Sequence, residues 1–146
     1  MSGKNVSNVF IVDCENVGAK ALEAAMEYVD DLDNSEVVLF LSQNVGKDTV
    51  YKMMNVLANT GAVISVEWHN AVGKNALDAK IITYLTLRIS ENCKFFIISN
   101  DKGYLASTEF LTMKGYGNAS LLRPSVCAVH ESGDTGFFDN VCLGYA

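Results

Sequence analysis

Apolar positions along this chain form two alternating patterns. Short, nearly continuous apolar runs predict strands at 8–13, 36–42, 62–68, 94–99 and 118–122. Between them, apolar residues recur at helical spacing and predict helices at 19–32, 47–59, 75–90 and 103–113. Leu22, Ala25, Met26 and Val29 mark the apolar face of the first helix. Strands that alternate with helices indicate βαβ units and a parallel sheet.

Right-handed crossovers leave few orders for five such strands. Order 3-2-1-4-5 places the first and fourth strands side by side. A flavodoxin-like order, 2-1-3-4-5, places the third strand between them. The choice matters because ligands bind at the carboxyl edge of such sheets, where the loops after neighbouring strands meet.

Length and composition limit the classes of protein to consider. The 146 residues fit one domain, with a core at about 8–123 and a C-terminal extension at 124–146 that adds a hairpin or packs as a tail. No apolar run is long enough for a membrane span, and no signal peptide is recognisable, so we expect a cytoplasmic protein. None of the four cysteines forms a CxxC pair, which argues against a zinc site. The net charge of −6 counts against simple binding of nucleic acid.

Three aspartates stand where such a sheet would present its ligands. Asp13 ends the run VFIVD, Asp101 closes FFIISND, and Asp78 lies three residues into a predicted helix. Taken singly, each has an ordinary structural explanation, as a turn residue or a helix cap. Together at one sheet edge, they offer the carboxylate oxygens that Mg²⁺ requires.

Three sequence blocks resemble PIN-like domains and the related NYN branch. The blocks are VFIVDCENVG, GKNALDAKIITYL and FFIISNDKGYLASTEFLTMKGYGNASLL, and the GKNALD wording is similar to bacterial PIN-like domains. The positions that match are Asp13, Asn16, Asp78, Ser99, Asp101, Gly103 and Tyr104. Their order and spacing cover the chain from Val9 to about Leu122.

The resemblance implies a Rossmann-like three-layer α/β/α sandwich, and we predict a parallel five-stranded sheet in order 3-2-1-4-5. It also implies metal-dependent hydrolysis of RNA, less often DNA, with Mg²⁺ or Mn²⁺ held by Asp13, Asp78 and Asp101. In supporting roles, Ser99 would orient a carboxylate and Asn16 would hold a water on the metal. Lys74 and Lys102, in loops at the same edge, are the candidates for phosphate contacts.

One departure from the family pattern keeps a second interpretation open. Many relatives have another Asp where this chain has Gly103. A fourth acid would then come from Glu15, Glu67 or Asp134. With no fourth acid, the alternative is a catalytically degenerate PIN-like module that binds RNA or a partner protein. A homodimer is plausible in either case, although no residue identifies its interface.

Overall fold

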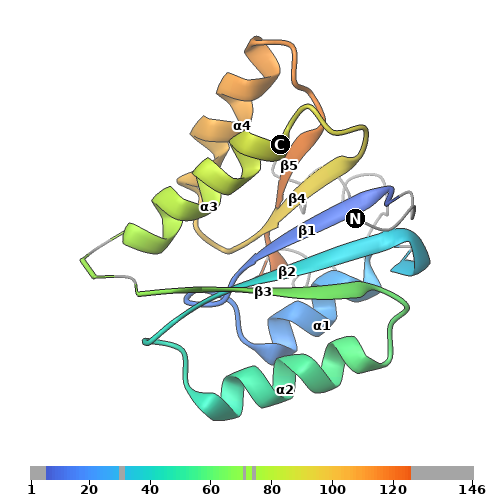
Figure 1. The fold of residues 1–146 in the computed structure, drawn as a ribbon, viewed down its shortest axis with the longest axis vertical. Coiled ribbons are helices and arrows are strands. Elements are labelled where there is room, and N and C mark those ends of the chain that lie inside the picture. The colour runs from blue at the N-terminus through green and yellow to red at the C-terminus, as the bar shows by residue number, and fades with distance from the viewer. Residues whose placement is uncertain (1–5, 30–31, 71, 74, 126–146) are drawn as a thin grey trace.

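Five strands and four α-helices alternate along the part of the chain that the computed structural model describes, residues 6–29, 32–70, 72–73 and 75–125 (Figure 1). The strands are β1 (Asn8–Asp13), β2 (Ser35–Ser42), β3 (Val63–His69), β4 (Lys94–Ile98) and β5 (Ala119–Leu122). The helices are α1 (Ala19–Glu27), α2 (Lys47–Ala58), α3 (Ala76–Arg88) and α4 (Tyr104–Met113), with a short 3₁₀ turn at Leu32–Asn34.

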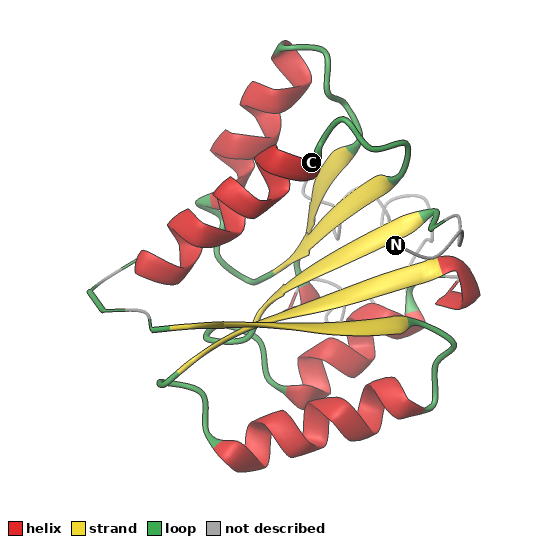
Figure 2. Cartoon of the chain, viewed as in Figure 1, coloured by secondary structure: helices red, strands yellow, loops and turns green. Residues whose placement is uncertain are grey.

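The strands form one parallel sheet in the order β3-β2-β1-β4-β5. Helices α1 and α2 cover one face, and α3 and α4 cover the other (Figure 2). The predicted three-layer fold and strand order are therefore confirmed, and the flavodoxin-like order is excluded. Because β1 lies between β2 and β4, the residues that follow these strands meet at the centre of the carboxyl edge.

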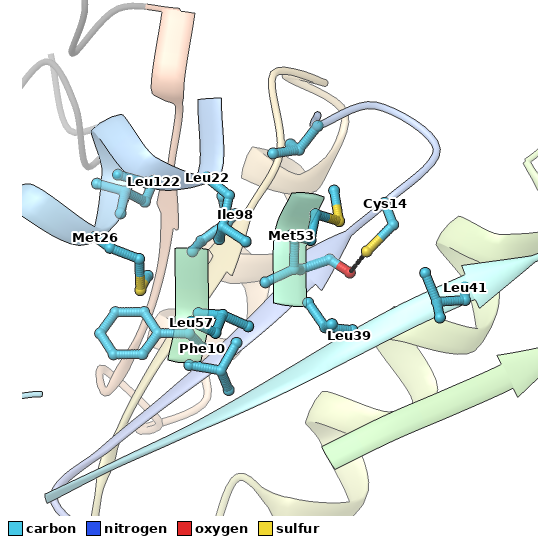
Figure 3. Packing of buried hydrophobic residues seen from close by; sticks show 14 residues of the cluster. Phe10, Cys14, Leu22, Met26, Leu39, Leu41, Met53, Leu57, Ile98 and Leu122 are labelled. Atoms are coloured by element: carbon cyan, nitrogen blue, oxygen red, sulfur yellow. Dashed lines mark hydrogen bonds between the residues drawn. The ribbon is translucent and has the colours of Figure 1, made fainter. Parts of the chain in front are cut away.

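The central strand divides the core into two clusters. Phe10 and Val12 pack beneath α1 and α2, whereas Val9 and Ile11 pack beneath α3 and α4. This alternation follows from the period of two along a strand. Cys14 belongs to the first cluster, where its thiol lies 3.6 Å from the Val12 carbonyl oxygen (Figure 3). Burial raises the pKa of this thiol to about 12, so Cys14 is a core residue rather than a nucleophile.

The helix boundaries differ from the sequence prediction by at most two residues except at the end of the first helix, and two of the differences have a clear cause in the backbone. The first helix, expected at 19–32, ends at Glu27, where the Tyr28 and Val29 amides donate to the carbonyls of Ala25 and Met26. These hydrogen bonds to the carbonyl three residues earlier are of the 3₁₀ type, and they tighten and end the last turn of the helix. The third helix, expected from 75, begins at Ala76 because Asn75 adopts a left-handed backbone with φ of 65°. Residues 126–146 of the predicted extension lie outside the described residues.

Candidate active site

Asp13, the last residue of β1, carries a fully buried carboxylate. Its Oδ2 atom accepts hydrogen bonds from Asn16 Nδ2 at 2.7 Å, the Tyr104 hydroxyl at 3.0 Å and Ser99 Oγ at 3.1 Å. Its Oδ1 atom accepts a hydrogen bond from the Glu15 amide at 3.3 Å. A buried carboxylate is tolerated only when it is compensated in this way. Ser99, expected to orient a carboxylate, and Asn16, expected to hold a water on the metal, thus both donate to Asp13.

Tyr104 connects Asp13 to a second aspartate. The Tyr104 hydroxyl lies 3.1 Å from Asp78 Oδ1 as well as 3.0 Å from Asp13 Oδ2. Burial, together with the negative charges of the two aspartates, raises the pKa of the Tyr104 phenol. The hydroxyl therefore keeps its proton, and one proton is shared between two carboxylates.

Asp78 lies in the first turn of α3 and is partly exposed. Burial raises its pKa, and the charges of Asp13 and Asp101 raise it further, while the hydrogen bond from Tyr104 opposes the shift. Asn75 stands at the N-cap position of α3 without making a side-chain cap, while Asp78 in the first turn is also favoured there by the helix dipole. Asp78 is thus a carboxylate in a locally negative field, which a bound cation would relieve.

Asp101 is held by the turn that follows β4. Its amide donates to Ser99 Oγ at 3.1 Å, and its Oδ1 atom accepts the Gly103 amide at 2.8 Å. The structural alternative for Asp101 was the N-cap of the following helix, which is wrong, because Gly103 stands at the N-cap position of α4. The bond from the Gly103 amide instead gives Asp101 the geometry of an Asx turn. A Cβ atom at Gly103 would lie 3.1 Å from that same oxygen, tighter than an ordinary contact. The glycine that replaces the family's second aspartate thus leaves room for the Asp101 carboxylate.

Glu15 lies on the opposite wall of the same site. Its Oε2 atom accepts hydrogen bonds from the Ser42 hydroxyl and, at 2.9 Å, from Asn44 Nδ2. Ser42 ends β2 and Asn44 follows it, so this wall is built from the strand next to β1. These two donors consequently fix the orientation of the Glu15 carboxylate.

These residues surround an open pocket of about 590 Å³ at the carboxyl edge of the sheet. It is lined by Glu15, Asn16, Gln43, Asn44, Val72, Gly73, Asn75, Asp78 and Asp101. Among the predicted site residues, the pocket thus brings together Glu15, Asn16, Asp78 and Asp101, while the buried side chains of Asp13 and Ser99 hold the network that leads to it.

The remaining predicted residues take other places. Lys102 is exposed beside Asp101 without lining the pocket, and Lys74 lies outside the described residues. Glu67 lines a different pocket, and Asp134 lies outside the described residues. Of the three candidates for a fourth acid, Glu15 is therefore the one that the structure places at the site.

Sequence reasoning assigned no role to three residues of this site. Tyr104 matched the family pattern as an aromatic, but its hydroxyl had no predicted partner. Ser42 and Asn44 carried the same signal that identified Asp13, a polar residue directly after an apolar run that ends at the carboxyl edge. Because β2 pairs with β1, the residues that follow β2 lie beside those that follow β1 and belong to the same site.

The donor set suits a hard divalent cation. In the described part of the chain, no three His, Cys, Asp or Glu side chains are grouped closely enough to enclose an ion. Mg²⁺ does not need such a cage, since proteins commonly bind it through one or two carboxylates and leave it several waters. Asp78 and Asp101 offer that pair in an open polar pocket, where burial first and the charges of Asp13 and Asp101 second raise the pKa of Asp78. The residues present therefore fit Mg²⁺ or Mn²⁺.

Comparison with known proteins gives one match. A family model described as PIN domain matches residues 7–121, most of the chain. No curated protein and no solved structure matches. Within the described residues, none of the helices has the length and apolar character that crossing a membrane would require.

Proposed function

The chain belongs to the PIN domain family, whose members are generally nucleases, and on this premise we propose that it is a divalent-metal-dependent endoribonuclease acting on single-stranded RNA. The observation that carries the proposal is the hydrogen-bonded network from Asp13 through Tyr104 to Asp78, which opens into a pocket shared with Asp101. This places three family-matched acids at the sheet edge where open α/β proteins bind their ligands.

In the proposed reaction, each acid has a separate task. Asp78 and Asp101 would hold Mg²⁺ or Mn²⁺ from the pocket side, and the buried carboxylate of Asp13 would complete the set of acids. The ion would supply Lewis acidity at the phosphate and a nucleophile at neutral pH. Tyr104 and Ser99 fix the orientation of the carboxylates, as donors to metal ligands commonly do.

Glu15 is our proposed fourth acid. Its carboxylate faces the same pocket as Asp78 and Asp101 from the β1–α1 loop. The hydrogen bonds from Ser42 and Asn44 to its Oε2 atom hold it there. Its Oε1 atom accepts no hydrogen bond from the described residues and would serve a ligand water or a second ion. Glu15 would thereby take over the role that the family's second aspartate has at the position of Gly103.

Two lysines are our candidates for contacts with the phosphates of the substrate. Lys102 is exposed next to Asp101, and we propose that it contacts the substrate backbone together with Lys74. Because the chain carries a net charge of −6, the bound divalent ion would provide much of the attraction for phosphate.

The test is cleavage of labelled single-stranded RNA, with single- and double-stranded DNA alongside. Wild type and Asp101→Asn would be compared in Mn²⁺, Mg²⁺ and EDTA. We expect cleavage of RNA that requires the metal and falls at least about 100-fold in the variant, which loses a ligand charge but little volume. Glu109→Gln, an exposed acid on α4 outside the pocket, is the matched control and should cleave like wild type.

Two results would contradict the proposal. Equal cleavage by wild type and Asp101→Asn would place the activity elsewhere or in a contaminant. A complete lack of cleavage, with no rise in melting temperature on adding Mn²⁺, would favour the degenerate module that binds RNA or a partner protein.

A further inference from the structure

A second pocket, of about 350 Å³, lies between β3 and α3 and takes no part in the proposed chemistry. It is lined by Phe40, Glu67, His69, Ala79, Lys80, Thr83, Tyr84 and Leu87. Aromatic and aliphatic side chains thus make up more than half of the lining residues, and a few polar groups stand among them. That composition is typical of a pocket for a small planar group rather than for an ion.

The aromatic side chains are fixed in their positions. The His69 ring stacks on Phe40 with centroids 5.2 Å apart and planes 10° apart, and Tyr84 meets Phe40 edge-on, also at 5.2 Å. Phe40 itself is buried and forms the base of the pocket. Arg88 holds Tyr84 through a hydrogen bond of 2.8 Å to its hydroxyl oxygen. A flat ring entering this pocket would meet preformed aromatic surface, so little ordering would oppose its binding.

Polar groups lie within the same wall. The Glu67 carboxylate is 3.3 Å from His69 Nε2, and Lys80 and Thr83 come from successive turns of α3. Acceptors and donors set among apolar surface are what the edge of a nucleobase needs. A lipid chain or an aliphatic side chain would leave these polar groups without partners.

The pocket adjoins the acid-lined site. Asp78 lines one pocket and its neighbour Ala79 lines the other, so the first turn of α3 separates them. A strand whose phosphodiester lay at Asp78 and Asp101 would have the second pocket on the other side of this one helical turn. From this continuity and the aromatic lining, we propose that the pocket between β3 and α3 binds one nucleobase of the single-stranded RNA substrate, adjacent to the bond that is cleaved. The inference rests on the proposed nuclease function.

Leu87 allows this pocket to be altered with little risk to the fold. Its side chain is 78% exposed at the pocket wall, and Met113, on α4 and outside the pocket, is 79% exposed. Leu87→Glu would bring a negative charge to the pocket, and Met113→Glu adds the same charge elsewhere. Comparing the two variants separates an effect on the pocket from a general effect of charge.

The experiment measures the affinity of fluorescein-labelled single-stranded RNA by anisotropy in Ca²⁺, with the RNA checked to be intact afterwards. A series of oligonucleotides carries one abasic nucleotide at each position in turn. For wild type we expect one position at which removing the base weakens binding about tenfold, as the loss of one stacked base should. Leu87→Glu should bind the intact RNA about tenfold less tightly and lose its sensitivity at that position, while Met113→Glu keeps both values of wild type.

The outcomes distinguish this inference from the proposed function. If wild type binds and cleaves RNA but Leu87→Glu responds to every abasic position as wild type does, the nucleobase pocket is wrong and the nuclease stands. If neither binding nor metal-dependent cleavage of RNA is found, both proposals fail. Tight binding of a wholly abasic strand would also overturn the pocket, because backbone contacts alone would then account for the affinity.

Discussion

The hydroxyl of Tyr104 lies 3.0 Å from Asp13 Oδ2, although the two residues are 91 positions apart in the sequence. The same hydroxyl is 3.1 Å from Asp78, so one proton serves two acids that belong to different elements. Among the described residues, this tyrosine is what joins the buried carboxylate at the end of β1 to the partly exposed one in α3. The relative position of the two acids therefore depends on a side chain that would not itself react.

Removing this hydroxyl should weaken the proposed metal site. We expect Tyr104→Phe to lower the affinity for Mn²⁺ about tenfold, since donors that orient metal ligands commonly have effects of this size. Titration calorimetry on the metal-free protein measures it without any need for substrate. Tyr84→Phe is the matched control, because its hydroxyl also has a charged partner, Arg88, but lies outside the acid-lined pocket. Equal Mn²⁺ affinity in the two variants would show that Tyr104 does not position the ligands.

The raised pKa of Asp78 predicts how stability depends on pH. A carboxyl whose pKa is higher in the folded state binds its proton more tightly there, so its contribution favours folding at low pH and is lost as pH rises through the folded pKa. Asp78→Asn should therefore melt at a higher temperature than wild type at pH 7 in EDTA. The gain should be at most about 1 kcal/mol, or about 2–4 °C, because Asp78 is partly exposed.

Two further measurements belong to the same variant. Near pH 4 and below, the difference in melting temperature between Asp78→Asn and wild type should shrink, because wild-type Asp78 is then protonated. Saturating Mn²⁺ at pH 7 should reverse the order, since an ion bound by the carboxylate stabilises the wild-type fold. A wild type that is more stable than Asp78→Asn in EDTA at pH 7 would contradict the electrostatic picture.

Asp13 and Asp101 should differ sharply in their effect on folding. Asp13→Ala takes away the acceptor of the buried Ser99 hydroxyl and of the Asn16 amide, and it leaves Tyr104 with Asp78 alone. We expect it to lower the free energy of unfolding by at least about 2 kcal/mol, measured by urea denaturation in EDTA. Asp101→Ala loses mainly its bond from the Gly103 amide, which is exposed, and should cost less than about 1 kcal/mol. Similar losses for the two variants would argue against the buried network as a folding element.

Glu15 and Glu67 provide a direct comparison for the fourth acid. Glu15→Gln should reduce metal-dependent cleavage of RNA about tenfold or more, because a charge is lost from the acid-lined pocket. Glu67→Gln leaves that pocket unchanged and should retain metal affinity like that of wild type. Both exchanges keep the side-chain shape, so circular dichroism should be the same for the two. A larger loss of Mn²⁺ affinity in Glu67→Gln than in Glu15→Gln would show that Glu15 is not the fourth acid.

Much of this architecture could be predicted because its signals are local. The apolar runs that end at Asp13 and Asp101 identify both the strands and the edge, and the spacing of the blocks indicates the family. The contacts of Tyr104 and Glu15 were beyond such reasoning, since they depend on which strands are neighbours and on where a side chain points after its strand ends. The end of α1 at Glu27 was also missed, because the apolar periodicity continues to Val29 although the backbone bonding pattern changes first.

The central position of β1 has a consequence for when activity can arise. The Ser99–Asp13 hydrogen bond closes a loop of 86 residues, and β4 joins the sheet beside β1 only after β2, β3 and three crossovers have been made. Contacts of such long range form late, because the entropy of closing the loop must be overcome first. A chain emerging from the ribosome would thus carry Asp13 and Asp78 well before it carries Asp101. For the proposed nuclease, this order of synthesis would delay cleavage of the messenger or ribosomal RNA around it until Asp101 has been added and folded into place.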